Sequence, residues 1–403
     1  MARNIQSLLR ITSNVFHQNI TKNLSLSGTR TLYSASALGI DGYKRTRENI
    51  RQQFLTMSDK FREKMHVYVD GESRNMIFTE DLKNMLHLVD NNTDDLELLL
   101  KMMVKFNDQN KEMRFGSFIF GPVVMRAYYY LDKPDEALAA FNNPALDGFF
   151  DQVISYQILM DMLYNHNKFS ELKQVFESIS VRNADFSKMP RHAVNLVLAG
   201  CYKENTPESM QYALELWQKC KEEGQYPMRR SSTFFAGLAL NQGKPDIATE
   251  VLFNVKQGSY ITVRNLKVMG LADLNRLDDV VPILRMSLSN DTPVQVKQTY
   301  TKEVIEKVEE AIQRAQLSGN ETIVNLVRQL KQNGHIIDTN LDDLITAEIA
   351  AYPKTMGDNR NFNNNNNNNF NNNFNHNSND NYQQARPRRQ FINYQRPGLK
   401  ELI

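Results

Sequence analysis

The chain has 403 residues, 41% of them hydrophobic, and carries 48 basic and 46 acidic residues, which gives a net charge of +2. This length can bury a large core. The near balance of charge argues against indiscriminate binding to polyanions, which depends on neutralising many phosphates. Two cysteines do not make a disulfide framework, so we expect both as buried thiols in helices. No apolar run approaches the roughly 18 residues of a membrane span, so disulfide-rich and membrane-spanning classes are excluded.

Residues 1–35 differ from the rest of the chain in charge. All 46 acids lie beyond residue 40, whereas four of the 48 basic residues lie before it. The apolar residues from Ile5 to Phe16 fall on one helical face, and Arg10 interrupts the unbroken apolar core that a secretory signal needs. An acid-poor, arginine-containing amphipathic start is typical of a mitochondrial transit peptide. We therefore expect a mitochondrial matrix protein whose transit peptide is cut near residues 30–34.

The segment after this start predicts two helical units. Residues 43–77 predict an N-terminal helical cap that begins with one charged helix over residues 43–65. Its apolar stripe could seat against the first repeat and consists of Phe54, Met57, Phe61 and Met65. Residues 78–117 predict a first helical hairpin.

Residues 153–179, VISYQILMDMLYNHNKFSELKQVFESI, contain two short helical patterns. Apolar residues recur at helical spacing from Ile154 to Leu163 and again from Phe169 to Ile179. The polar residues 165–167 separate the two stripes, so the segment predicts an antiparallel helical hairpin. Such a hairpin cannot bury both stripes alone and needs a similar neighbour on each side.

The same pattern recurs roughly every 35 residues. The units lie near residues 118–152, 153–190, 191–228, 229–260 and 261–290, and residues 300–350 predict C-terminal capping helices. The fold class we predict is all-α, a right-handed α-solenoid of helix–turn–helix repeats with disordered N- and C-terminal segments. The Trp-Leu-Gly-Tyr pattern of tetratricopeptide repeats is missing.

The central hairpin resembles a pentatricopeptide repeat. The residues that carry the resemblance are SYQILMDML at 155–163, KFSEL at 168–172 and VF at 175–176. The other four units fit that family's pattern in part, and the resemblance covers about residues 61–344. It implies an α-solenoid in which each repeat reads one RNA base through two or three side chains.

The resemblance also assigns RNA-contacting positions. The base-reading position early in each first helix falls on Pro122, Gln157, Asn195, Thr233 and Asn265. A short amide or hydroxyl can hydrogen-bond a base edge, whereas Pro122 cannot donate. The second position, at the junction to the next repeat, falls near Gln152, Pro190, Met228 and Tyr260, where the family uses Asp or Asn, so no target sequence can be read. Next to Met228, Arg229 and Arg230 could contact phosphates or satisfy helix-end carbonyls.

The acidic pairs 94–95, 135–136 and 278–279 raise the possibility of metal-dependent catalysis. Each pair instead falls in the first turn of a second helix, where a carboxylate caps free N–H groups and meets the positive end of the helix dipole. The seven histidines lack zinc-ligand spacing, and neither a P-loop nor a nucleophile elbow is present. We therefore expect no enzyme, no cofactor, no metal and no small-molecule substrate.

Residues 357–403 form an asparagine-rich tail that turns basic at its end. Its low apolar content predicts disorder. Arg386, Arg388 and Arg389 stand near Phe391 and Tyr394, a mixture that suits phosphate contact and base stacking on single-stranded RNA, although a merely solubilising tail is an equal reading.

The sequence thus favours a non-catalytic protein that binds mitochondrial RNA. The resemblance implies a role in maturation of mitochondrial transcripts and, through them, in respiratory-chain function. Mitochondrial RNA-processing proteins are further candidate partners. The alternative is a protein–protein scaffold in RNA processing or ribosome assembly, and a third reading is a metal-dependent RNA-processing enzyme. A binding face of Asn, Thr and Arg would favour RNA, whereas exposed Tyr, Phe and Leu would favour protein.

Overall fold

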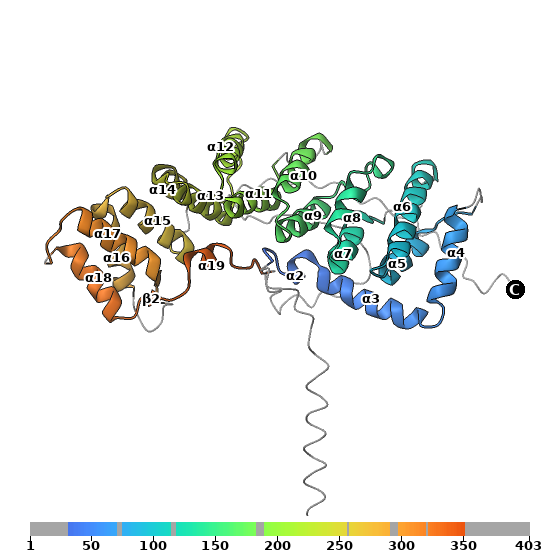
Figure 1. Cartoon of the computed structure of the whole chain (residues 1–403), viewed down its shortest axis with the longest axis horizontal. Coiled ribbons are helices and arrows are strands. Elements are labelled where there is room, and N and C mark those ends of the chain that lie inside the picture. The colour runs from blue at the N-terminus through green and yellow to red at the C-terminus, as the bar shows by residue number, and fades with distance from the viewer. Residues whose placement is uncertain are drawn as a thin grey trace, which may run out of the picture. The chain divides into compact units, whose positions relative to one another are not determined.

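The computed structural model describes residues 31–70, 75–113, 118–182, 189–255, 258–290, 297–319 and 321–350 (Figure 1). These residues are almost entirely α-helical and form a series of stacked helix pairs. The predicted all-α solenoid is therefore confirmed. The predicted tail at 357–403 and most of the predicted transit peptide lie outside the described residues.

The five predicted repeats are five pairs of antiparallel helices. The first helices contact one another in sequence and make one row: α7 (Gly121–Leu131), α9 (Val153–Asn165), α11 (Arg191–Glu204), α13 (Arg229–Asn241) and α15 (Ile261–Asp273). The second helices pack against this row: α8 (Pro134–Phe141), α10 (Phe169–Arg182), α12 (Pro207–Glu222), α14 (Pro245–Phe253) and α16 (Leu277–Ser289). A short 3-10 helix, η1 (Pro144–Leu146), follows α8.

The turn inside each pair uses the same local device. Every first helix of the five pairs is followed by one residue in the left-handed region, with φ between 49° and 66°: Asp132, Asn167, Asn205, Gly243 and Asn275. Asn, Asp and Gly tolerate this conformation better than other residues. Three of the second helices then begin with proline, which suits the first helical position. The turn sequences therefore fix where one helix ends and the next begins.

The described residues before the first repeat form five helices: α2 (Ala35–Leu38), α3 (Ile40–Phe54), α4 (Ser58–Asp70), α5 (Thr79–Leu88) and α6 (Thr93–Met113). The single helix predicted over 43–65 is wrong, because the chain breaks at residues 55–57. The break lets α3 pack on α5 and α7 while α4 packs on α6. Tyr43 and Met65 are buried, whereas Met57 is exposed at the turn. The rings of Phe54 and Phe61 meet across it, 5.3 Å between centroids.

The C-terminal part adds α17 (Lys302–Arg314), α18 (Thr322–Gln332) and α19 (Leu341–Ile345). Between them lies a small element that the sequence did not predict. Strand β1 (Tyr300–Thr301) pairs in parallel with β2 (Ile336–Ile337), with Tyr300 opposite Ile336. This pairing brings residues 297–301 onto the side of α15.

Two end segments of the described chain meet on the row of first helices. Residues 31–39 form what we call the N-terminal strap, and residues 341–349, which include α19, form the C-terminal strap. Tyr33 and Ile349 make a parallel bridge, in which Ser34 N–H donates to Ile349 C=O at 3.1 Å and Ile349 N–H donates to Leu32 C=O at 2.8 Å. Figure 1 shows the coil that follows α19 running toward the start of α2. Leu32 and Tyr33, inside the predicted transit peptide of 1–35, are buried in this contact. A processed chain keeps this contact only when cleavage falls before Leu32, at the start of the predicted 30–34 cleavage region.

Two further sequence expectations concern residues inside the helices. Cys201 and Cys220 are buried free thiols, as predicted. Within the described ranges, no helix has both the length and the apolar character required to cross a bilayer.

One glycine sets the distance between the first two repeats. A Cβ added to Gly121 would lie 2.7 Å from the backbone oxygen of Phe149 and 2.8 Å from Ser155 Oγ. We predict that Gly121→Ala lowers the free energy of unfolding by about 1–3 kcal/mol, since overpacking forces backbone shifts. Urea denaturation followed by circular dichroism would measure this change. Gly42→Ala in α3 is the control, because open space surrounds that position; an equal loss in both variants would contradict the proposed clash.

Candidate functional site

The central first helices are buried on nearly every side. In α9 all residues from 155 to 164 are buried, and in α11 all residues from 193 to 202 are buried. Neighbouring first helices, the second helices and the two straps together provide this cover. The face that the resemblance assigns to RNA therefore already contacts other parts of the same chain.

Asn195 of α11 contacts the N-terminal strap. Its side-chain amide donates to the Tyr33 hydroxyl at 3.2 Å, and its oxygen accepts from Ser231 Oγ at 3.1 Å. The Tyr33 hydroxyl also lies 3.0 Å from His192 Nδ1. Asn195 is fully buried, so both its donor and its acceptor are used within the protein.

Thr233 and Arg230 of α13 lie beneath the C-terminal strap. Thr233 is fully buried, and its hydroxyl donates to the Arg230 carbonyl at 2.8 Å. The Arg230 guanidinium donates to the backbone oxygens of Leu344 and Ala347. A Cβ on Gly237 would lie 3.2 Å from Ile345 Cδ1, which shows how closely α19 approaches α13.

Asn265 of α15 is covered by the segment that enters β1. Its amide nitrogen donates to the carbonyls of Ile261 and Thr299, and its oxygen accepts from Thr301 N–H at 2.9 Å. Gln157 of α9 is also buried. The side chains predicted to read bases thus lie on successive first helices. Asn195, Thr233 and Asn265 are fully buried in this conformation, Gln157 is nearly so, and Pro122 is partly exposed.

Asp161 of α9 is the acidic group at the centre of the strap contact, a role that the sequence analysis missed. It accepts from Tyr33 N–H at 3.1 Å, from the Tyr129 hydroxyl at 3.0 Å and from Asn165 Nδ2 at 3.1 Å. Burial raises the pKa of the Asp161 carboxyl to about 7. A lone acid inside an otherwise apolar helix was the available sequence signal.

The amino-terminal ends of the first helices carry an unusual charge pattern. No acidic residue lies in the first turn of α9, α11, α13 or α15, whereas each second helix from α8 to α16 has one or two there. Arg191 opens α11, and Arg229 with Arg230 opens α13. Cations at this end face the positive pole of the helix dipole, so helix stability does not favour them.

Two of these arginines retain exposure. Arg191 is exposed, and Arg229 is partly exposed with its guanidinium carbon 3.4 Å from the centroid of the Tyr260 ring. Tyr260 precedes α15 and is itself exposed. We call Arg191, Arg229 and Tyr260 the cationic edge. The other predicted cations, Arg386, Arg388 and Arg389, lie outside the described residues.

The acidic pairs lie where the sequence analysis placed them. They occupy the first turns of α6, α8 and α16, and Asp95 accepts from the Arg62 guanidinium at 2.9 Å. Among the described residues, no three His, Cys, Asp or Glu side chains converge in a geometry suited to a metal ion.

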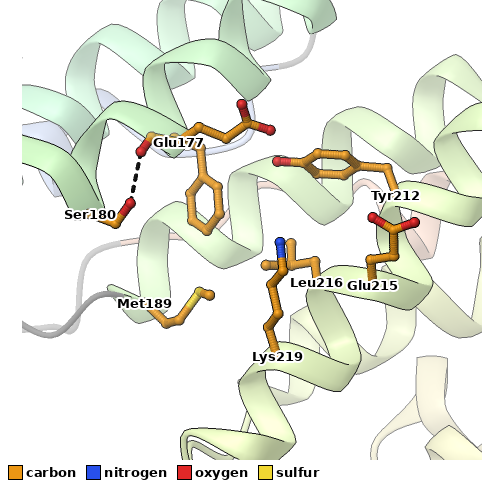
Figure 2. A pocket seen from close by; sticks show the side chains of 8 residues that line it. Glu177, Ser180, Met189, Tyr212, Glu215, Leu216 and Lys219 are labelled. Carbon is orange, nitrogen blue, oxygen red and sulfur yellow. Dashed lines mark hydrogen bonds between the residues drawn. The ribbon is translucent and has the colours of Figure 1, made fainter.

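The second helices border a small groove between α10 and α12. Figure 2 shows the Tyr212 hydroxyl pointing toward Glu177, with Lys219 directed into the gap. The cavity measures about 140 Å³, and two acidic side chains, Glu177 and Glu215, line it beside one lysine. This charge does not suit an anionic polymer.

Large apolar side chains are exposed at or near the C-terminal ends of successive second helices. They occur at or near the ends of α10, α12 and α14 and on α16: Val181 at 83% exposure, Tyr226 at 86%, Phe253 at 83% and Met286 at 62%. One such residue occurs in each of four successive pairs. An exposed apolar side chain is ordinary when isolated, but a recurring series is typical of a protein-contact surface.

Comparisons with known proteins agree with the resemblance seen in the central hairpin. The chain is 31% identical over 238 residues to "Pentatricopeptide repeat-containing protein 2, mitochondrial" of Mus musculus, covering 59% of this chain and 61% of that protein. It is 28% identical over 277 residues to the Danio rerio protein of the same name, covering 68% and 71%. These relatives confirm the resemblance to the pentatricopeptide repeat family. No family model matches the chain.

Solved structures give a more distant likeness. The crystal structure of the pentatricopeptide repeat protein PPR10 from maize is 14% identical, with a TM-score of 0.38 over 82% of this chain and 48% of that one. A complex of PPR10 with an 18-nt psaJ RNA element is 12% identical, with a TM-score of 0.35 over 83% and 48%.

The raised pKa of Asp161 predicts how stability depends on pH. The folded protein retains a proton on this carboxyl up to about pH 7, whereas the unfolded chain releases it near its ordinary value of 3.8. Stability from this group is therefore highest in acid and decreases as pH rises from about 4 to about 7. We predict that Asp161→Asn removes this decrease. Denaturation across that pH range, with exposed Asp338→Asn as control, would measure it; an unchanged slope in Asp161→Asn would contradict the assignment.

Proposed function

We propose that this protein binds single-stranded RNA in the mitochondrial matrix and contributes to maturation of mitochondrial mRNA, and thereby to respiratory-chain function, without a catalytic activity of its own. The name shared by its relatives supports the compartment. The series of helix pairs supports binding to an extended polymer, because repeats present equivalent positions at regular intervals.

The cationic edge is the observation on which this proposal chiefly rests. Arg191 and Arg229 begin neighbouring first helices that contact each other. Their charges lie at helix ends whose dipoles add to the positive potential. A guanidinium stacked on an exposed aromatic ring, as Arg229 is on Tyr260, offers a phosphate contact beside a surface on which a base can stack.

In this proposal the base-reading residues are not available for the first contact with RNA. They are Gln157, Asn195, Thr233 and Asn265, and the same holds for Arg230. Because they are engaged within the protein, the cationic edge makes the first contact with RNA. Arg386, Arg388 and Arg389 of the tail add phosphate contacts, which a short array of five pairs needs for affinity.

A protein–protein scaffold in RNA processing or ribosome assembly is the second candidate function. The exposed side chains Val181, Tyr226, Phe253 and Met286 favour it, because one recurs at or near the end of each of four successive second helices. Mitochondrial RNA-processing proteins are candidate partners for this series.

We predict that Arg191→Glu together with Arg229→Glu weakens binding to a random-sequence pool of short single-stranded RNA by at least about tenfold. The slope of log affinity against log salt should decrease by about 1.4, that is about 0.7 for each lost phosphate contact. Fluorescence anisotropy over a salt series would measure both. Lys219→Glu with Arg285→Glu is the matched control, since it makes the same charge change on exposed second-helix positions.

Ultraviolet crosslinking in intact mitochondria would identify the RNA. We expect the wild-type protein to enrich a defined set of mitochondrial transcripts, the arginine pair variant to lose them, and a deletion of residues 357–403 to lower their yield. Absence of enriched RNA from the wild type would exclude the RNA proposal and favour the scaffold.

A further inference from the structure

The N-terminal strap and the segment that enters β1 occupy hydrogen-bonding groups that a nucleic-acid base would use. The Asn195 amide donates to Tyr33 and accepts from Ser231. The Asn265 amide is paired on both sides by the backbone of residues 299–301. A base edge offers the same combination of donor and acceptor. The chain's own segments thus satisfy the groups that the resemblance assigns to RNA.

The N-terminal strap combines one aromatic anchor with a short backbone contact. The Tyr33 ring is buried among α9 and α11, where its hydroxyl meets His192 and Asn195 and its N–H meets Asp161. Farther along, Arg126 Nε donates to the Leu38 carbonyl at 2.8 Å. The intervening Ala35 and Ser36 are exposed.

The C-terminal strap is held by polar contacts and by the buried side chains Leu341 and Ile345. Tyr202 donates its hydroxyl proton to Asp342 at 2.8 Å, Arg230 contacts two backbone carbonyls, and Ile345 is buried against α13. Helices as short as α2, with four residues, and α19, with five, are not stable by themselves. The straps therefore depend on packing against the row, and segments at the ends of a folded region can open locally before the core unfolds.

We propose that the two straps form a reversible internal cover that competes with single-stranded RNA for the row of first helices. In the closed state the straps engage Asn195 and Arg230, whereas Asn265 is covered by residues 299–301, which belong to neither strap. In the open state the Tyr33–Ile349 bridge is broken, and Asn195 and Arg230 become available to RNA. This inference rests on the function proposed above and adds its regulation.

The proposal makes a quantitative statement about affinity. If only a fraction of molecules is open, the apparent dissociation constant exceeds the intrinsic one by the inverse of that fraction. An open population of about 1–10% would reduce affinity by about 10- to 100-fold. A variant that releases the straps should therefore bind RNA more tightly by the same factor, although the substitution adds no contact with RNA.

The test compares the full-length wild type with Tyr33→Ala, which removes the anchor, and Tyr33→Phe, which removes only its hydroxyl. Met286→Ala, at an exposed side chain on α16, is the control. Affinity for the random-sequence RNA pool would be measured by anisotropy. Hydrogen exchange at the amides of Tyr33, Ser34 and Ile349 would report the closure directly, and circular dichroism would verify that the helices remain.

We expect Tyr33→Ala to bind RNA at least about tenfold more tightly than wild type, Tyr33→Phe to fall between them, and the control to be unchanged. In the wild type, RNA should accelerate exchange at the three amides. RNA binding with equal affinity in all variants, or with the amides still protected, would overturn the cover and leave the RNA-binding function intact. If Tyr33→Ala loses helicity, the RNA affinity of Tyr33→Phe and hydrogen exchange in the wild type test the cover instead. Absence of binding by every variant would overturn both proposals.

Discussion

The apolar character of the first helices on every side is the constraint on which the rest of this structure depends. A helix that presents one stripe needs one neighbour, but α9 and α11, buried over ten consecutive residues each, need cover all round. Adjacent first helices cover two sides and the second helices a third. The remaining side would expose apolar surface to water, so segments from the two ends of the folded chain close it.

The cover on this side also supplies hydrogen-bond partners for polar side chains that are buried in the first helices. The first helices contain a few polar residues within their apolar surroundings, among them Asp161 and Asn195. A buried donor or acceptor without a partner costs about 1–3 kcal/mol. Tyr33 supplies a backbone N–H to one and a hydroxyl to the other. The straps therefore stabilise the row both by covering apolar surface and by completing its hydrogen bonds, and removal of either strap requires water or another molecule to take over those bonds.

Local patterns were sufficient to predict the helix pairs. The 3.6-residue periodicity of residues 153–179 and the recurring Asn, Asp and Gly turns are encoded within each repeat, so the position of every pair followed from short stretches of sequence. The acidic first turns followed for the same reason. The break between α3 and α4 was missed because no Gly or Pro marks residues 55–57, and tertiary packing decides it.

The site was less predictable, because its geometry depends on contacts between distant residues. Nothing around Tyr33 indicates that it meets Ile349, and β1 pairs with β2 through two residues each. The available signal lay in the run from 193 to 202, AVNLVLAGCY, which contains a single strongly polar residue. An open polar-lined groove would require more of them. Asn195, Thr233 and Asn265, which the resemblance assigns to RNA, lie on successive first helices, but the resemblance carried no information about what covers them.

The bridge between Tyr33 and Ile349 changes how this repeat protein is expected to assemble. In an open array each repeat contacts only its neighbours, so folding can spread from any point and the loss of a terminal repeat is felt locally. Here the final contact joins residues at opposite ends of the sequence, which slows its formation because a long loop must close first. Helix pairs can form as the chain emerges into its compartment, but the central row is completed only after residue 349 has arrived. A shortened chain lacking either end would therefore be weakened in the middle, at α9 and α11, rather than at the end where it was cut.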